Sequence, residues 1–332
     1  MSSGRDYAGG VCCALGAVTA MKPDPRFLKQ PKSFWANVRT ISQQVGYTKP
    51  AEGYWKVPRG LTVPQNFKKH GGPKKNLVLA ADLTSIRDAF QTLGLRADHI
   101  IKPNGKPTKQ GQLLSDYLQY RADVLNNDVE PRLMDAEAAR KAFEKCRARY
   151  SPTIPPVMNK QKGSKRAEAY LTCMVNMIVE THGNRYGFDL DPHRLTTVTK
   201  DDQPLRTLAR RLDGAFPSVI NPIAVWEIKE YYYTTTFGSR VADGVYETLL
   251  DGMELEELQE SEGVRVKHYL FADSHFTWWA CGKSYLCRMI DMLHMGYVDE
   301  MLLGREVTER LPELVQEWVA EAKRRGLPKK KS

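Results

Sequence analysis

The pattern of apolar and polar positions in the second half of the chain predicts two adjacent strands joined by a tight turn. Two apolar runs, 215–220 and 223–228, stand on either side of Asn221-Pro222, and an Asn-Pro pair is a turn signal. The second run is apolar without interruption as far as Trp226, which is typical of a strand covered on both faces. We therefore expect the second strand to be central in a buried sheet.

Segments with helical or strand spacing surround this pair of strands. We expect helices over 167–182, 240–259, 281–295 and 307–325, and further strands over 194–199 and 264–271. The order from residue 167 is therefore a helix, three strands, a helix, a strand and a helix. This order predicts an α/β fold of the α+β kind, with a mixed sheet covered by helices.

The first half of the chain is predicted to be mostly helical, with basic loops between the helices. Helices are expected over 34–45, 77–95, 113–125 and 136–150. Ser33 is a plausible N-cap and Gly46 a plausible stop for the first of them. Residues 49–76 are rich in Pro, Gly and Lys, so we expect an exposed basic loop there. Residues 1–21 form either a loosely ordered arm or a short buried helix.

A proline-rich segment and a change of charge divide the chain. Residues 151–156 contain three prolines and make the best boundary, so we expect a mostly helical region over 1–156 and a second region over 157–332. Residues 1–166 hold 29 Lys and Arg against 13 Asp and Glu, a net +16, whereas the whole chain carries +10. A basic half joined to an acidic half indicates a phosphate-rich partner, although many soluble proteins are mildly basic.

Charged side chains stand at the end of the predicted strand pair. Glu227 and Lys229 are two residues apart on one strand, so both point to the same face. Asp213 opens the other strand, and pairing across the turn brings it near Glu227. Two adjacent carboxylates repel each other, and Mg²⁺ is commonly held by one or two carboxylates plus a substrate phosphate. The alternative is an ion pair at a solvated strand end, which the buried run before Glu227 disfavours.

Asp213 followed by Glu227-x-Lys229 on a buried strand resembles the PD-(D/E)XK nuclease superfamily, and more particularly its type II restriction endonucleases. The resemblance covers residues 163–300, and Leu212 stands where many members have proline. It implies a restriction-endonuclease-like αβββαβ core. It also implies Asp213, Glu227 and Lys229 as the catalytic residues, with Asp213 and Glu227 as metal ligands and Lys229 positioning the attacking water. The implied cofactor is Mg²⁺, with Mn²⁺ as a substitute.

The resemblance also implies a third acidic metal ligand on the helix before the first strand. Glu168 is that candidate, and the alternative is a glutamate that caps the start of the helix. Glu180 is a weaker candidate. The RecB-like exonuclease branch has a glutamine–tyrosine pair on the next helix, where this chain has Arg240, Asp243 and Tyr246. This departure favours the restriction branch.

Composition argues against a membrane span, a secreted disulfide framework and a zinc site. No apolar run approaches eighteen residues, and the stretch 10–21 follows Asp6 and is too short for a secretion signal. Six cysteines without a C-x-x-C pair favour a reducing, cytoplasmic location. Four closely spaced His and Cys residues match no zinc pattern: His268, His275, Cys281 and Cys287.

These observations together predict a Mg²⁺-dependent endonuclease that hydrolyses double-stranded DNA, of the sequence-specific type II restriction kind. A repair, transposition or phage-defence nuclease of the same fold is one alternative, and a DNA-binding protein without catalysis is another. The residues that contact DNA are not assigned, and no small-molecule cofactor or membrane partner is expected.

A homodimer is expected, because one metal site is aligned with one scissile phosphate and a duplex has two strands. The helices over 281–295 and 307–325 are candidates for part of the interface. The alternative is that both helices pack on their own sheet.

Overall fold

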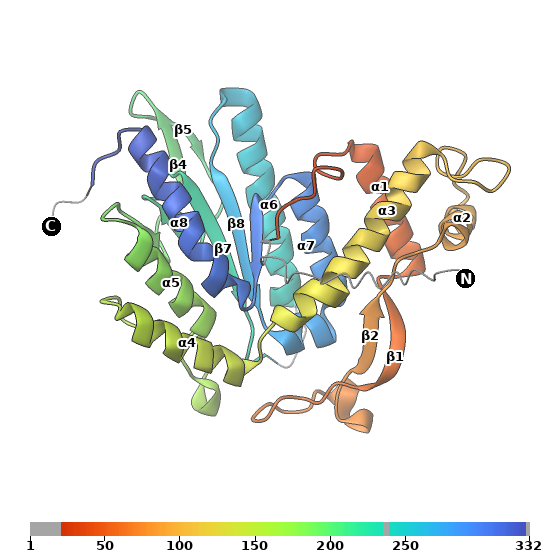
Figure 1. The fold of residues 1–332 in the computed structure, drawn as a ribbon, viewed down its shortest axis with the longest axis horizontal. Coiled ribbons are helices and arrows are strands. Elements are labelled where there is room, and N and C mark those ends of the chain that lie inside the picture. The colour runs from red at the N-terminus through yellow and green to blue at the C-terminus, as the bar shows by residue number, and fades with distance from the viewer. Residues whose placement is uncertain (1–20, 235–238, 330–332) are drawn as a thin grey trace, which may run out of the picture.

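The computed structural model describes residues 21–234 and 239–329, with the side chains of 239 and 240 left out (Figure 1). The predicted arm at the N-terminus, apart from Met21, and the last two lysines of the basic tail lie outside the described residues.

A mixed sheet forms the centre of the second half, as the sequence predicts, and it has five strands, of which the two edge strands are not among those predicted. Its strands, in spatial order, are β3 (Asp189–Leu190), β6 (Gly214–Phe216), β7 (Ala224–Glu230), β8 (Lys267–Asp273) and β9 (Glu300–Leu303). The first three strands are antiparallel, and β7, β8 and β9 run parallel. The tight pairing of β6 with β7 confirms the predicted strand pair, although β6 is shorter than its apolar run.

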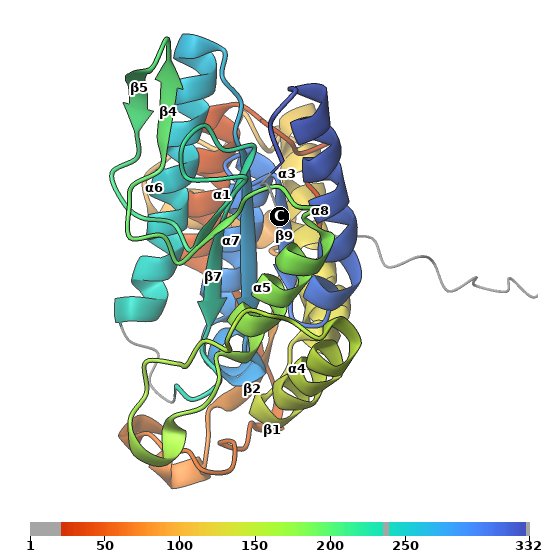
Figure 2. The same cartoon turned by 90° about the vertical axis from the view of Figure 1, so that its left-hand side faces the viewer.

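Helices cover both faces of this sheet (Figures 1 and 2). They are α5 (Tyr170–His182), α6 (Ser239–Glu262), α7 (Lys283–Met295) and α8 (Glu306–Arg324). Trp226 of β7 lies in one hydrophobic cluster with α5 and α8, whereas its neighbour Val225 lies in another with α6. Side chains of β7 therefore alternate between an α5–α8 face and an α6 face.

One predicted strand has a different partner from the one expected. The sequence predicts a strand over 194–199 as the first strand of the main sheet, but β4 (Thr197–Lys200) pairs with β5 (Gln203–Thr207) in a separate hairpin. The turn residues Asp201 and Asp202 have positive φ angles, which Asp tolerates better than most residues. The Thr- and Val-rich composition indicated a strand correctly, but composition does not specify the pairing partner. The edge of the main sheet next to β6 is formed by β3 instead.

The N-terminal region is mostly helical, as the sequence predicts, but it also contains one β-hairpin that the sequence does not predict. Its elements are α1 (Lys32–Val45), β1 (Thr48–Tyr54), η1 (Gln65–His70), β2 (Lys74–Val78), α2 (Leu83–Thr92), α3 (Lys109–Asp123), a π-helical turn η2 (Val124–Val129), η3 (Glu130–Arg132) and α4 (Ala136–Tyr150). Helix α1 begins before Ser33, which is therefore not its N-cap. The expected loop over 49–76 overlaps the antiparallel strands β1 and β2, whose mostly exposed residues show no alternating pattern.

Two sets of contacts connect the N-terminal region to the sheet. Helix α4 shares a hydrophobic cluster with α5 and α8, so it packs with the second half of the chain. Arg121 of α3 is buried and forms an ion pair of 3.0 Å with Asp291 of α7. Tyr117 donates a hydrogen bond of 2.6 Å to the same carboxylate. These contacts fix α3 against α7.

The apolar faces of α7 and α8 are buried inside the chain. Leu286 and Ile290 of α7, and Leu311 and Trp318 of α8, are all at most 2% exposed. Packing on their own sheet, the alternative named above, is therefore what the structure shows for both helices. No described helix has the length and apolar composition needed to cross a membrane, and the four described cysteines are free thiols.

Gly214 of β6 lies under the indole ring of Trp226. A Cβ atom at this position would lie 2.1 Å from that ring. Trp226 in turn stacks on Trp318, with ring centroids 5.5 Å apart, so it has no free space into which to move. Overpacking of this kind costs about 1–3 kcal/mol.

We therefore predict that Gly214→Ala lowers the free energy of unfolding by about 1–3 kcal/mol in denaturant titrations. The smaller ring of Trp226→Phe should reduce the cost of Gly214→Ala when both substitutions are combined. An equal cost in both backgrounds would contradict the proposed contact.

Candidate active site

Glu227 and Lys229 lie on the α6 face of β7, as the two-residue spacing predicts. Glu227 is 0% exposed and Lys229 is 7% exposed. The Nζ atom of Lys229 lies 2.5 Å from Oε2 of Glu227. Gly244 of α6 leaves room for the lysine, because a Cβ atom there would lie 3.2 Å from Lys229 Cδ. The pair is therefore buried between the strand and a helix.

Asp213 lies immediately before β6 and beside this pair. Gly214 is paired with Trp226, so Asp213 stands at the next position of the hairpin, opposite Glu227. Its Oδ2 atom accepts a hydrogen bond of 2.7 Å from the backbone N–H of Ile228. The structure thus brings together the three residues that the motif singled out.

Three further charged residues complete the cluster, and the sequence analysis did not identify them. Arg210 donates to Glu227 Oε1 at 2.7 Å and to Asp251 Oδ2 at 2.6 Å. It also lies 3.2 Å from Glu247, which contacts Lys229 at 3.2 Å. Glu247 and Asp251 are four residues apart on α6, so an acidic pair on the inward face of this helix was the available signal. Nothing in the sequence marked Arg210.

The pKa values of the cluster follow from burial and from its excess of carboxylates. Burial, and then the charge of Glu227, raise the pKa of Asp213 to about 6 and that of Asp251 to about 7. Burial also opposes ionisation of Glu227, but Lys229 and Arg210 outweigh it and lower its pKa. Burial disfavours the charged form of Lys229, yet Glu227 and Asp213 raise its pKa above the ordinary value. The lysine therefore remains an ammonium ion.

Glu168 does not join this cluster. Helix α5 begins at Tyr170, three residues later than expected, and Glu168 precedes it in an isolated bridge with Met158. Its charge is among the causes that raise the pKa of Tyr170 and of Cys173, after burial. Glu180, the weaker candidate, bonds to Thr153 near the other end of α5. The acidic residues that a helix contributes to the cluster, Glu247 and Asp251, come instead from α6, the helix after β7.

The donor set of the cluster fits a hard divalent cation such as Mg²⁺. Four carboxyl groups, those of Asp213, Glu227, Glu247 and Asp251, face only two cations, Arg210 and Lys229. Carboxylate oxygens are the ligands that Mg²⁺ prefers. No three His, Cys, Asp or Glu side chains in the described ranges form a ready-made metal site, and here Arg210 contacts three of the carboxylates.

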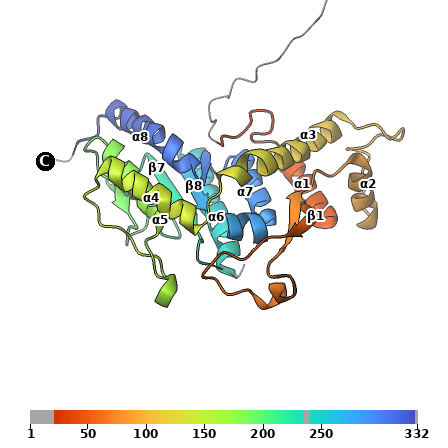
Figure 3. The ribbon, with the colours of Figure 1, turned by 60° about the horizontal axis from the view of Figure 1, so that its bottom comes forward.

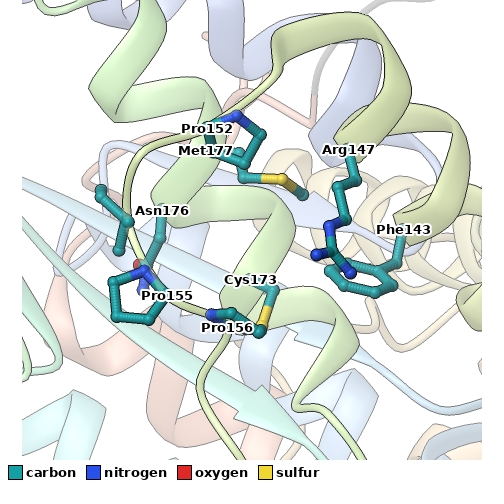
Figure 4. A pocket seen from close by; sticks show the side chains of 9 residues that line it. Phe143, Arg147, Pro152, Pro155, Pro156, Cys173, Asn176 and Met177 are labelled. Atoms are coloured by element: carbon teal, nitrogen blue, oxygen red, sulfur yellow. The ribbon is translucent and has the colours of Figure 1, made fainter.

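A separate hollow lies between α4, α5 and the proline-rich segment (Figure 4). Phe143, Arg147, Cys173 and Asn176 line it, and no carboxylate does. Helix α5 covers the face of the sheet to which Trp226 points, so the sheet separates this hollow from Glu227. We do not assign the chemistry to it.

Fold and site together define a mixed α/β protein with a buried cluster of charges beside a central strand. The chain belongs to the family described as "Domain of unknown function (DUF7687)", which matches residues 134–318. A second family, "Domain of unknown function (DUF7690)", matches residues 21–128. The expected boundary at 151–156 therefore lies inside the larger match. Comparisons with curated proteins and with solved structures gave no match.

Two more carboxyl groups end the central strands, that of Glu230, which is half-buried, and that of Asp273, which is buried. Glu230 of β7 accepts a hydrogen bond of 2.9 Å from the N–H of Thr172. Asp273 of β8 accepts bonds from Met134 N at 2.8 Å and from the hydroxyl of Tyr232 at 2.6 Å. Burial, above all other causes, raises the pKa of each of the two carboxyl groups to about 7.

Asp273 predicts a pH dependence of stability. Its pKa is higher in the folded chain, about 7 against 3.8, so the folded state binds the proton more tightly. The contribution of Asp273 to stability is therefore largest at low pH and falls as pH rises between these values, by about 1 kcal/mol per pH unit. Asp273→Asn should remove this fall, measured by denaturant titration at several pH values between 5 and 7. Equal slopes of unfolding free energy against pH in the variant and the wild type would contradict this role of Asp273.

Proposed function

We propose that the protein is a Mg²⁺-dependent endonuclease of double-stranded DNA with a restriction-endonuclease-like core. The observation that carries the proposal is the meeting of Asp213, Glu227 and Lys229 at one buried position on paired strands. The elements of the main sheet and its helices follow in the order α5–β3–β6–β7–α6–β8 once the separate β4–β5 hairpin, inserted between β3 and β6, is set aside. This order, with β7 parallel to β8, supports the proposal because it fits the αβββαβ arrangement. The type II restriction activity is the specific form we favour.

The residues of the cluster have distinct roles in this proposal. Asp213 and Glu227 would hold the metal, and a bound Mg²⁺ would supply charge that stabilises the oxygens of an in-line displacement at phosphorus. Lys229 is held on Glu227 as an ammonium ion, so it acts by charge and hydrogen bonding. It orients the attacking water and offsets the charge that develops on the phosphate.

Two basic loops are the candidate DNA contacts. Residues 55–76, around η1, contain six Lys and Arg and no Asp or Glu, and residues 157–166, around η4 (Gly163–Lys165), contain four and none. None of these ten side chains, all of them described, forms an ion pair. Both loops lie at the end of the molecule toward which β7 points (Figures 2 and 3). Unneutralised charge at this end of the molecule favours a polyanionic backbone.

The alternatives remain a repair, transposition or phage-defence nuclease with the same site, and a DNA-binding protein without catalysis. A homodimer also remains part of the proposal, because a duplex has two strands to cut. Its interface would have to use surfaces other than the buried apolar faces of α7 and α8.

We predict that Glu227→Gln, Asp213→Asn and Lys229→Met each reduce cleavage of plasmid DNA in Mg²⁺ by at least about a hundredfold. Binding of the same DNA, measured by fluorescence anisotropy, should survive. Glu260→Gln, on the exposed side of α6, is the matched control and should cleave normally. Cleavage that persists in excess chelator would refute the metal-dependent mechanism, and binding without cleavage by the wild type would favour the non-catalytic alternative.

The loops predict a specific salt dependence. Replacing Lys68 and Lys69 by alanine, or Lys160 and Lys162, should flatten the plot of log affinity against log salt concentration. The slope should change by about 1 for each lysine that contacts a phosphate. Lys102 and Lys106, exposed in the turn between α2 and α3, provide the control pair. Equal slopes for the control and the loop variants would exclude these loops from the interface.

A further inference from the structure

Arg210 lies at the centre of the carboxylate cluster and bonds to both of its fully buried members. Its Nη1 atom lies 2.7 Å from Glu227 Oε1 and 2.6 Å from Asp251 Oδ2. Lys229 occupies the other oxygen of Glu227, Oε2, at 2.5 Å. The guanidinium therefore bridges one oxygen of Glu227 and one of Asp251, which is the position that a shared cation would take.

Asp251 has an unused ligand atom. The residue is 0% exposed, and its Oδ1 atom is buried without a hydrogen-bond partner. A buried carboxylate oxygen without a donor costs free energy, so such atoms in a folded protein call for an explanation. The other oxygen of Asp251 shares Arg210 with Glu227, which directs this carboxyl group into the cluster.

The backbone around Arg210 is held independently of its guanidinium. Arg206 forms an ion pair of 2.5 Å with Glu257 of α6, and the N–H of Ala209 donates to Glu254 at 3.1 Å. These bonds fix the segment along α6. The side chain of Arg210 is 24% exposed, so it can turn toward solvent without moving this backbone.

We propose that Asp251 is a further ligand of the divalent cation at Glu227, and that Arg210 competes with the cation for these two carboxylates. The inference rests on the proposed function, because it places an additional ligand at the same metal site. Arg210 carries a single positive charge, whereas the cluster has two more carboxyl groups than cations. A divalent ion matches that excess, and its arrival releases the guanidinium to the solvent side, where Glu247 lies 42% exposed.

The proposal is tested by measuring Mn²⁺ binding, with electron paramagnetic resonance to count free and bound ions. Asp251→Asn should weaken binding by at least about tenfold, since it removes a ligand charge. Arg210→Gln should tighten binding severalfold, because the competitor is gone. The control is Glu260→Gln, which alters an exposed acid of the same helix outside the cluster and should bind as the wild type does. Circular dichroism checks that each variant is folded.

The outcomes separate this inference from the proposed function. Wild-type protein that binds no Mn²⁺ would overturn both. Binding that is lost in Glu227→Gln but unchanged in Asp251→Asn would overturn the inference alone. Weaker binding in Arg210→Gln would also overturn it, because a residue that supports the ion, rather than competing with it, gives that result. If Arg210→Gln does not fold, Arg210→Lys is used in the same binding measurement. Lysine keeps the positive charge but lacks the several fixed N–H donors of a guanidinium.

Discussion

Burial of charge beside the β6–β7 hairpin is the constraint on which the rest of the structure depends. Glu227 is completely covered, and a covered carboxylate is tolerated only when cations and hydrogen bonds compensate it. Lys229 and Arg210 provide that compensation from β7 and from the segment before β6. Because Asp213 and two acids of α6 lie in the same place, compensation is incomplete. An excess of buried carboxylates is costly for stability and useful for binding a cation.

The remainder of the fold holds this costly arrangement in position. On the opposite face of β7, Trp226 stacks on Trp318 of α8 and anchors the strand through apolar contacts. The ion pair between Arg121 and Asp291 joins the N-terminal helices to α7. The β1–β2 hairpin is anchored by Trp55, whose ring centroid lies 5.0 Å from that of His275, the first residue of a π-helical turn η5 (His275–Cys281) after β8. The basic loop that this hairpin carries therefore has a defined place relative to the carboxylates.

The sequence predicted the parts of this arrangement that depend on local pattern. Asn221-Pro222 and its flanking apolar runs specified the hairpin, and alternation along β7 placed Glu227 and Lys229 on one face. Local sequence pattern does not predict contacts between segments that are distant in the chain. Arg210 reaches the cluster only because the chain runs along α6, and Asp251 looks in sequence like any acid of an amphipathic helix. Resemblance to a family is the only ground for predicting Glu168 as a ligand, and the late start of α5 leaves this residue outside the cluster.

The central claim is that this buried cluster binds the cation that promotes DNA cleavage. The most direct test is a crystal structure of the protein with duplex DNA and Mn²⁺, in which anomalous scattering locates the ion. The account predicts an anomalous peak coordinated by Asp213 and Glu227 and adjacent to a DNA phosphate, with Lys229 beside it. DNA bound elsewhere, with no peak at these carboxylates, would contradict the account.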